Sequence, residues 1–411
     1  MTGTDVTEIA LGSLFVVLLV VALTVVLMFA RRRLLPQGAV RVTVNGGMGI
    51  EAARGDPLLG VLHGAGIGIP AACGGSGTCG LCRVGVEGAG AGEVQATERA
   101  LLSPAERRAH VRLACQVRLR GPVDVTVAAD VLAAESFPCR VLSNRMLAPL
   151  IRELVLELPE GRAFPFRAGG FAQLTAPAYG LDFSGIDIDP AYAQAWRIAG
   201  WPALKSVSTE PVTRAYSIAS RPEDAGRIVF NIRLAVPPAG REHDIPPGIV
   251  SSWLFALKPG DTVETGGPFG EFHVQPTDRD MVFIGGGVGM APLRAMIHEQ
   301  IALGTRRRMT YFYGARTAAD LFYVEEFEAI AARHENFTWT PALSDPAPSD
   351  RWTGATGFIH ETVRAALAGH PAPDECEYYL CGPPVMISAV LAMLDRLGVE
   401  PHSIFNDDFG G

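Results

Sequence analysis

The stretch "PAACGGSGTCGLC", Pro70 to Cys82, places three cysteines within ten residues and separates them mainly by Gly, Ser and Thr. A fourth cysteine, Cys115, follows at a distance in "RLACQ". The 411-residue chain holds seven cysteines in all, an odd and bunched set that is untypical of a disulfide framework. Thiolates so close together on a glycine-rich loop predict a metal centre in a reducing compartment.

The spacing of these cysteines indicates the kind of metal centre. A plant-type 2Fe–2S cluster takes three thiolates from one loop and a fourth from a distant position. Here the loop reads C-x5-C-x2-C, one residue longer in its first gap than the plant pattern. Structural zinc is the alternative, but zinc sites usually pair two C-x-x-C-like hooks and this chain has one. We predict a 2Fe–2S cluster with metal ligands Cys73, Cys79, Cys82 and Cys115.

The composition limits the classes of protein to consider. A hydrophobic content of 48% with 19% charged residues is typical of folded protein. The chain is too long for one hydrophobic core and is expected to form two to four domains. Its formal net charge of −8 makes nucleic acid an unfavourable partner, because phosphate binders carry a concentrated basic face.

The N-terminal region predicts a membrane anchor. Ala10–Ala30 holds 21 residues without a charge and is followed at once by Arg31–Arg33. A helix of that length spans roughly 31 Å, enough to cross the hydrocarbon core of a bilayer. The alternative is a cleaved signal peptide, but here acidic residues precede the apolar run and basic ones follow it. We expect a single span in the lipid bilayer, with the rest of the chain cytoplasmic.

Three regions follow this anchor, which we assign to residues 1–35. Residues 36–131 contain strand and helix patterns that predict an α+β domain of the β-grasp ferredoxin kind. Within it, "LLSPAERRAHVRL" is expected to form a helix that begins at Ser103. Residues 132–276 carry short strands between Gly and Pro, which predicts an antiparallel β-barrel interrupted by an irregular insertion over 176–211. Residues 277–411 alternate strand and helix, which predicts an α/β doubly wound parallel sheet.

Two motifs in the barrel region indicate a flavin. In "RAYSIAS", Tyr216 offers a ring to stack on isoalloxazine, Ser217 a hydroxyl near N5 and Arg214 a charge for pyrophosphate. Further on, "GIVSSW" suits a phosphate at a helix N-terminus; its candidate residues are Gly248, Ser251 and Ser252. The alternative interpretation of the first motif is an Arg and a Tyr that simply pack in a barrel strand.

Two motifs in the last region indicate a nicotinamide dinucleotide. "FIGGGVGMAPLR" joins a buried strand to a helix, where bare backbone can approach a pyrophosphate; the candidates are Gly285, Gly286, Gly287 and Gly289. It is not a G-x-G-x-x-G motif, and no acidic residue follows about twenty positions on. In "CGPP", Cys381 ends a strand and is expected beside the nicotinamide ring. The alternatives are a ligand-free turn and a small buried thiol; Cys139 and Cys376 are interpreted as packing residues.

The order R-x-Y-S, G-x-x-S-S, GGGVGMAP and CGPP resembles the ferredoxin–NADP reductase superfamily with a fused plant-type ferredoxin. The chain is similar in more detail to the F-subunit family of the sodium-translocating NADH:quinone reductases. That resemblance covers essentially the whole chain and rests on "CGGSGTCGLC", "RLACQ", "KPGDTVETGGPFGEF", "CEYYLCGPP" and the ending "NDDFGG".

The resemblance implies a non-covalent FAD, a 2Fe–2S cluster, NADH as donor and quinone as final acceptor. It also implies other subunits of a multisubunit complex as partners, in a bacterial inner membrane. Catalytic roles fall on Ser217, Cys381 and Phe409, with Phe409 covering the flavin until nicotinamide displaces it, and Gly382 and Pro383 join Cys381 in binding the nucleotide. A flavin between a hydride donor and a one-electron cluster converts paired electrons to single ones, so no general acid or base is assigned.

Two other functions use the same modules. One is a reductase that feeds an oxygenase, and the other is a membrane-tethered electron carrier whose flavin and nicotinamide sites are inactive. The choice of NADH over NADPH rests on the resemblance alone, because Arg306–Arg308 and Arg316 carry charge that suits a 2′-phosphate.

Overall fold

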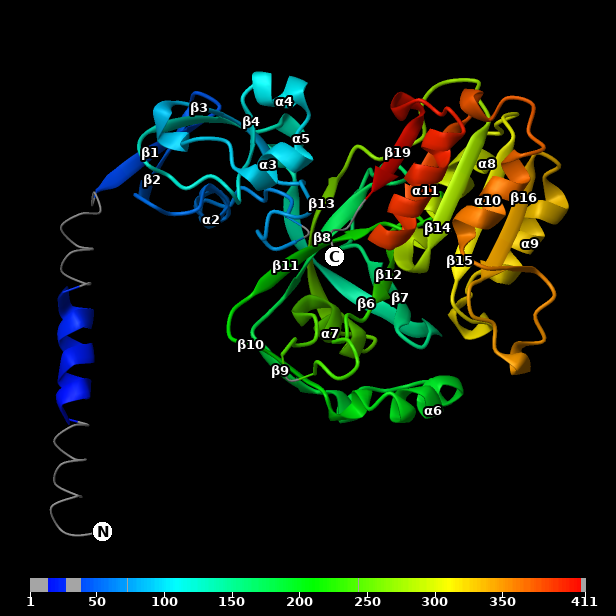
Figure 1. Cartoon of the computed structure of the whole chain (residues 1–411), viewed down its shortest axis with the longest axis horizontal. Helices are drawn as coiled ribbons and strands as arrows, with labels where there is room; N and C mark the ends of the chain where they lie inside the picture. The colour runs from blue at the N-terminus through cyan, green and yellow to red at the C-terminus, as the bar shows by residue number, and fades with distance from the viewer. Residues whose placement is uncertain (1–13, 27–37, 72, 243, 408–411) are drawn as a thin grey trace, which may run out of the picture. The chain divides into compact units, whose positions relative to one another are not determined.

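A computed structural model describes residues 14–26, 38–71, 73–242 and 244–407 (Figure 1). Residues 14–26 are helical and expose their large apolar side chains. Among the described residues, no helix has both the length and the hydropathy needed to cross a bilayer. The predicted anchor over 10–30 extends into 1–13 and 27–37, which lie outside the described residues.

The remaining residues form two compact units. The first comprises Met1–Gly66 with Arg83–Val127, and the second comprises Ile67–Cys82 with Ala128–Gly411. The cysteine loop is therefore counted with the second unit, although the strands on either side of it belong to the first.

The first unit is a five-stranded mixed sheet in the order β2-β1-β5-β3-β4, in which β1 and β5 run parallel. Along β1 the side chains alternate, so Val40, Val42 and Val44 are buried while their neighbours face outward. The strands are β1 Ala39–Val44, β2 Met48–Ala53, β3 Arg83–Glu87, β4 Val111–Leu113 and β5 Val123–Thr126, and the helices are α2 Leu58–Gly64, α3 Ala96–Leu101 and α4 Pro104–Arg108.

The helix expected over "LLSPAERRAHVRL" starts where predicted but is shorter. Ser103 caps α4 with a capping box: its hydroxyl accepts from the Glu106 N–H at 3.2 Å and its own N–H donates to the Glu106 carboxylate at 2.7 Å. The helix ends at Arg108, and His110 takes a left-handed φ of 57°. β4 then pairs with β3, so the prediction of helix through Leu113 is wrong. The reason is burial on both faces of the strand: Leu113 is fully buried, and Arg112 is buried in an ion pair with Glu98.

The first part of the second unit is an antiparallel six-stranded sheet in the order β11-β8-β13-β6-β7-β12. A bridge between Ile218 and Phe230 joins its two ends, which closes the sheet as the predicted barrel. A single apolar cluster fills it and includes Phe137, Leu154 and Phe230. The elements are α5 Ala129–Ala133, β6 Glu135–Ala148, β7 Ile151–Glu157, β8 Phe171–Ala176, β11 Val212–Ser217, β12 Arg227–Arg233, α7 Ile249–Ala256 and β13 Thr262–Phe269.

The predicted insertion forms a small structure of its own. It contains β9 Tyr179–Asp182, α6 Pro190–Ile198 and β10 Lys205–Ser208, with β9 and β10 paired antiparallel. Trp196 is buried between Trp201 and Phe255, at ring-centroid distances of 5.4 and 5.9 Å. Its indole N–H donates to the Pro149 carbonyl at 2.7 Å, which ties the insertion to the barrel.

The last part is a six-stranded parallel sheet in the order β17-β16-β15-β14-β18-β19. Alternate residues of β14 face different cores: Phe283 packs with α8 and α9, and Ile284 packs with α10 and α11. The sheet is thus covered on both faces, as the doubly wound prediction requires (Figure 1). The elements are β14 Met281–Gly286, α8 Met290–Ala302, β15 Met309–Ala315, α9 Val324–Arg333, β16 Phe337–Leu343, β17 Ala355–Thr356, α10 Ile359–Leu367, β18 Glu377–Cys381, α11 Pro384–Arg396 and β19 Ile404–Asp407.

Candidate functional site

The ends of β11, β18 and β19 lie close together. β11 ends at Ser217, β18 at Cys381 and β19 at Asp407. The Ser217 hydroxyl donates to Oδ2 of Asp407 at 3.5 Å, and Asp407 lies opposite Cys381 in the parallel register of β18 and β19. Two of the residues predicted to be catalytic therefore meet through Asp407. The third, Phe409, lies outside the described residues.

Asp407 is a candidate site residue that the sequence analysis missed. The available signal was the run "SIFND", Ser403 to Asp407, a short apolar stretch that ends in an acid. Because β19 has four residues and lies at a sheet edge, its pattern alone did not indicate a strand.

The flavin motif lies along β11 as the sequence predicted. Arg214 and Tyr216 are two residues apart and share one face of the strand, while Ser217 faces the other way. Arg214 donates from Nη1 to the carbonyl of Thr213 at 2.8 Å and is half-buried. Burial raises the pKa of Tyr216, so its ring is presented as a neutral phenol. This face combines a cation and an aromatic ring.

The second flavin motif lies at the start of α7, but its two serines have different roles. A Cβ at Gly248 would approach the Ser251 hydroxyl to 2.6 Å and the Ala235 Cβ to 2.8 Å, so this turn requires glycine. Ser251 Oγ donates to the Gly248 carbonyl and accepts from the Ala235 N–H, both at 3.2 Å. Ser252 Oγ is buried near the Tyr179 hydroxyl, and among the described residues it makes no hydrogen bond of regular geometry. Ser251 thus maintains the turn, and Ser252 retains a hydroxyl for a ligand.

The two nicotinamide motifs are in direct contact. A Cβ at Gly289 would lie 2.0 Å from the Cys381 carbonyl oxygen, and one at Gly382 would lie 3.0 Å from that of Gly286. Gly287 has a left-handed φ of 55° and open space where a Cβ would stand. Since α8 begins at Met290, its N-terminus opens directly behind this glycine turn. The arrangement suits a pyrophosphate that approaches bare backbone at a helix N-terminus.

Two of the arginines that left the nucleotide undecided, Arg307 and Arg316, have partners in the structure. Arg307 donates to the Glu377 carboxylate at 2.6 Å and to the Gln275 carbonyl at 3.0 Å, at the amino end of the sheet. Arg316 follows β15 at the carboxyl edge and donates twice to Oδ2 of Asp345, at 3.2 and 3.1 Å. Asp345 follows β16, the third strand of this region in chain order. An acidic residue therefore does lie at the carboxyl edge of the sheet, where a ribose is expected.

The cysteine loop has the backbone of a chain wrapped around a ligand. Its four glycines Gly74, Gly75, Gly77 and Gly80 all have left-handed φ, between 63° and 93°. Cys73 Sγ and Cys79 Sγ lie 3.3 Å apart. Burial alone would raise the pKa of Cys73, but hydrogen bonds from the Ser76 hydroxyl and backbone N–H groups lower it to about 5. The loop thus favours a thiolate, the form that binds metal.

The other two predicted ligands are buried. Cys82 is 1% exposed and Cys115 is 9% exposed, and Gln116 Nε2 donates to Cys115 Sγ at 3.3 Å. Cys115 belongs to the first unit and the loop to the second. In the described part of the chain, no group of three or more metal-ligating side chains is gathered as a metal site. The four-ligand set therefore stays a prediction.

Within the second unit, the cysteine loop contacts the flavin barrel. Gln173 on β8 donates from Nε2 to the Ile69 carbonyl at 3.2 Å. Gly74 lies directly against the Arg214 guanidinium. A Cβ on Gly74 would lie only 2.5 Å from Cζ of Arg214. The loop and the flavin strand are neighbours in this unit.

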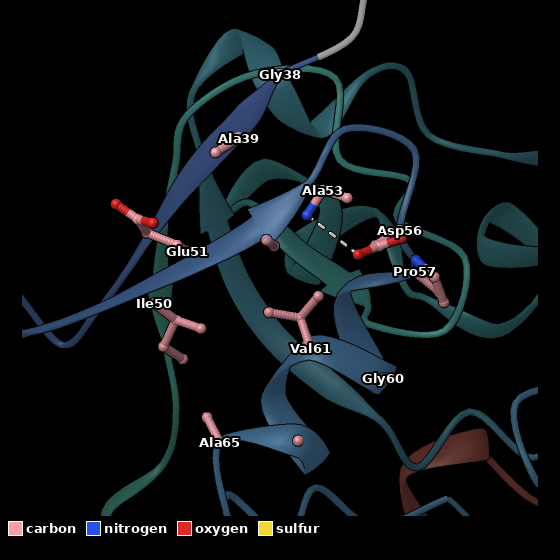
Figure 2. Close-up of a pocket in the computed structure, with 12 residues that line it drawn as sticks. Gly38, Ala39, Ile50, Glu51, Ala53, Asp56, Pro57, Gly60, Val61 and Ala65 are labelled. Atoms are coloured by element: carbon pink, nitrogen blue, oxygen red, sulfur yellow. Dashed lines mark hydrogen bonds between the residues drawn. The ribbon is translucent and has the colours of Figure 1, made fainter.

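A cavity of about 770 Å³ in the first unit lies apart from these motifs (Figure 2). It is lined by β1, β2 and α2, and the Ala53 N–H donates to Asp56 at its rim at 3.1 Å. Its walls are mostly small and apolar, and no predicted site residue lines it. It lies at the β2 edge of the sheet, opposite the β4 edge that leads to Cys115.

Three family models match the chain. Residues 42–120 match the 2Fe-2S iron-sulfur cluster binding domain, residues 203–274 the oxidoreductase FAD-binding domain and residues 283–391 the oxidoreductase NAD-binding domain. The three predicted cofactor types, a 2Fe–2S cluster, FAD and NADH, are confirmed by these matches.

Among curated proteins, the chain is 46% identical over 407 residues to the F subunit of a Na⁺-translocating NADH-quinone reductase of Neisseria meningitidis, covering 98% of this chain and 100% of the relative. The Methylococcus capsulatus protein of the same name is 46% identical over 406 residues, with the same coverage. Among solved structures, the Amycolatopsis cytochrome P450 reductase GcoB is 27% identical with a TM-score of 0.60, covering 90% of this chain and 98% of that one. A ferredoxin reductase of carbazole 1,9a-dioxygenase is 26% identical with a TM-score of 0.58, covering 91% and 99%.

Proposed function

We propose a residue-level route for electrons through this chain, which belongs to the F-subunit family of the Na⁺-translocating NADH-quinone reductases. The chain is the electron-input component that oxidises NADH, and it carries FAD and a 2Fe–2S cluster. This membership decides against the oxygenase reductase and against an inactive electron carrier. FAD, when bound, accepts two electrons with a hydride and releases them singly.

Residues of the barrel hold the flavin. Tyr216 would stack on the ring, Arg214 would neutralise the pyrophosphate and Ser252 would donate to a phosphate oxygen at the start of α7. The fit rests on three features of the structure. Arg214 and Tyr216 share one face of β11, the buried Ser252 hydroxyl makes no hydrogen bond of regular geometry among the described residues, and the Gly248 turn leaves no room for a side chain.

Residues of the parallel sheet hold NADH. The glycines of the β14–α8 turn receive the pyrophosphate, and Cys381, Gly382 and Pro383 receive the nicotinamide. The Ser217 hydroxyl and the Asp407 carboxylate then fix the reacting edge, and Phe409 occupies the nicotinamide position when NADH is absent. Catalysis is by placement, because hydride transfer needs aligned donor and acceptor atoms and no proton carrier.

Cys73, Cys79, Cys82 and Cys115 are the residues that would hold the cluster, which when bound would take up electrons one at a time. The low pKa of Cys73 and the left-handed glycines between the ligands support this ligand set. Gly74 lies beside Arg214, the residue that we assign to the flavin pyrophosphate. This contact keeps the cysteine loop beside the flavin strand.

The chain is anchored in the bacterial inner membrane by residues 10–30 and delivers its electrons to other subunits there. The uncharged run, the arginines that follow it and the exposed apolar side chains of the helix over 14–26 support the anchor. In cell fractionation, the full chain is expected in the membrane fraction. A chain lacking residues 1–30 that stays in that fraction after removal of the other subunits would contradict the anchor.

The observation that carries the proposal is the meeting of Ser217, Asp407 and Cys381. Replacing Ser217 by Ala removes the hydroxyl and is expected to slow flavin reduction by NADH by about tenfold, the value of one well-placed hydrogen bond in the transition state. The measurement is anaerobic stopped-flow bleaching of the flavin. The matched control is Ser184→Ala, whose exposed hydroxyl donates to Asp182 in the insertion. A Ser217→Ala rate within twofold of the parent, at normal FAD content, would overturn the role of Ser217.

A further inference from the structure

Arg294 is a buried cation that none of the motifs above includes. It lies on α8, the helix behind the glycine turn, and is 4% exposed. We propose that Arg294, held by Glu326, is a positioning residue that fixes α8 against the exit of the flavin strand, and so sets where the nicotinamide meets the flavin. The inference rests on the route proposed above and deepens it.

Arg294 uses its whole guanidinium to join two parts of the second unit. Nε and Nη2 donate to the two carboxylate oxygens of Glu326 at 2.6 and 2.9 Å, and Nη1 donates to the backbone carbonyl of Ala219 at 2.7 Å. Glu326 belongs to α9, on the same face of the parallel sheet as α8. Ala219 lies two residues beyond Ser217, on the chain that leaves β11. One side chain therefore connects the nucleotide-binding half to the flavin strand.

The Ala219 carbonyl belongs to a segment that is otherwise held by the barrel. The Ile218 N–H donates to Gly170 at 2.9 Å and the Ala219 N–H donates to Val229 at 2.7 Å. Ala219 also packs in a small apolar cluster with Val229 and with Ala291 of α8. Ala291 is two residues past Gly289, so α8 touches the strand exit within its first turn. A shift of α8 at this contact moves the glycine turn with it.

The neighbours of Arg294 fix its direction. Its guanidinium lies over the Tyr323 ring at 4.3 Å from the centroid, a cation–π contact. The Tyr323 hydroxyl donates to Glu153 at 2.5 Å and accepts from Asn231 at 2.9 Å, both on barrel strands. Tyr323 has a left-handed φ of 57°, unusual for a bulky residue, at the N-cap of α9. Thus α9, which carries Glu326, is itself tied to the barrel.

The hydrogen bonds around Glu326 favour its ionised form. Burial alone would raise its pKa, but hydrogen bonds from His298 and Arg294 lower it to about 2. His298 Nε2 contacts Oε1 at 2.7 Å, beside the Arg294 bond to the same oxygen. The planar guanidinium of Arg294 donates to the Glu326 carboxylate and to the Ala219 carbonyl at the same time. The single ammonium group of a lysine cannot reproduce that geometry.

The role follows from the sensitivity of hydride transfer to distance. A misplacement of about 1 Å costs roughly a hundredfold in rate when reacting groups must be aligned. A side chain that holds α8 to the flavin strand therefore affects the rate of hydride transfer more than the affinity for NADH.

The experiment compares Arg294→Lys with Arg145→Lys in the full chain. Arg145 lines the same polar pocket of about 270 Å³ and pairs with Glu153 at 2.7 Å, but its side chain is 59% exposed. For Arg294→Lys we expect flavin reduction at saturating NADH to slow by 10- to 100-fold, with the NADH dissociation constant within threefold of the parent. The primary isotope effect with 4-deuterated NADH should rise. Arg145→Lys should stay within twofold in each quantity.

A second readout needs no flavin. In flavin-depleted protein, amide hydrogen exchange at Ile218 and Ala219 should be about tenfold faster in Arg294→Lys than in the parent. The reason is that the Ala219 carbonyl is no longer held to α8 by Arg294, so this segment opens more often. Faster exchange spread evenly over the whole barrel would overturn the proposal in favour of general destabilisation. An Arg294→Lys rate within twofold of the parent, with FAD bound, would also overturn it.

Glu326→Gln keeps the proposal testable if Arg294→Lys does not fold. It retains the size of the side chain and weakens the hold on Arg294, so we expect a three- to tenfold slower flavin reduction at unchanged FAD content; an unchanged rate would overturn the proposal. Comparison with Ser217→Ala separates the two proposals. If only Ser217→Ala is silent, the role of Ser217 fails and the positioning role stands; if only the Arg294 and Glu326 variants are silent, the reverse holds.

Discussion

Two regions of the molecule, the cysteine loop and the edge formed by Ser217, Cys381 and Asp407, differ in how their candidate residues are brought together. The loop offers three of the four predicted ligands within ten residues of chain, with left-handed glycines that allow it to curve and a thiol whose pKa is lowered to about 5. The edge collects its residues from three strands that are far apart in sequence, and places them by register and by close glycine contacts.

This difference explains why one kind of site can be recognised from the sequence alone and the other cannot. Thiolate ligation depends on the ligands themselves, so their spacing is visible in a single loop. Hydride transfer depends on placement, and placement is a property of the sheet rather than of any one motif. The loop should therefore fail when one ligand is removed, and the edge should fail when its backbone is displaced.

Removal of one thiolate tests the loop with the largest expected effect. In Cys79→Ala, the NADH-reduced chain should lose the rhombic one-electron EPR signal completely, because a 2Fe–2S cluster needs all four ligands. Flavin bleaching by NADH should stay within about twofold of the parent. The control, Cys376→Ala, removes a buried thiol of the parallel sheet and should keep the signal. A normal EPR signal from Cys79→Ala would exclude this residue as a ligand.

Displacement of the backbone tests the edge. A methyl group at Gly289 would lie 2.0 Å from the Cys381 carbonyl, so Gly289→Ala must push the glycine turn away from the nicotinamide strand. We expect flavin reduction by NADH to fall by about a hundredfold, while FAD content and the cluster spectrum are retained. Gly369→Ala is the control, since its nearest atom would be 3.9 Å away. A Gly289→Ala rate close to that of the control would show that the contact does not place NADH.

The pH dependence of stability sharpens the comparison, because it isolates the ion pair that ties α8 to the barrel. The folded-state pKa of Glu326 is lowered to about 2 from a usual value of 4.5, so its stabilisation is complete above about pH 5 and is lost as the pH falls toward 2. At pH 7, Glu326→Gln should lower the free energy of unfolding by about 3 kcal/mol. Urea titrations of parent and variant should converge near pH 2. A difference that does not change with pH would mean that the carboxylate charge contributes nothing.

The smallest effect concerns the far end of the nucleotide. Asp345 neutralises Arg316 at the carboxyl edge, where a 2′-phosphate would have to bind. Asp345→Asn should raise the ratio of kcat/KM for NADPH to that for NADH by about tenfold, a modest change because the pair is exposed to solvent. Arg316→Gln should change the ratio in the opposite direction. An unchanged ratio in Asp345→Asn would place nucleotide selection elsewhere.

The architecture was largely predictable because its elements have clear periods. The buried run at β14 and the helix after it indicated a doubly wound sheet, and the short strands around β11 indicated a barrel. The error lay at Val111–Leu113, where three residues form a strand whose pairing with β3 depends on tertiary burial of Arg112. Short strands at sheet edges, such as β17 and β19, carry too few residues for a pattern.

Candidate site residues could be named from the sequence where a motif carried them and not where the fold assembled them. Ser217 and Cys381 stood out in "RAYSIAS" and "CGPP", and Ser252 in "GIVSSW". Asp407 and Asp345 did not, because an acid acquires a role only through the strand beside which it lies. Arg294 was hidden for the same reason: its partners are 32 and 75 residues away in sequence.

We propose that electrons enter this chain in pairs at the flavin, beside Ser217 and Cys381, and leave singly through the cysteine loop. The most direct test of this claim is anaerobic rapid mixing of the full chain with NADH, followed by optical spectra and freeze-quench EPR of the same samples. We predict that flavin bleaching comes first and that a rhombic signal of one spin per chain then appears at the rate at which flavin absorbance partly returns. A bleached flavin that stays reduced while the cluster remains oxidised would contradict the claim.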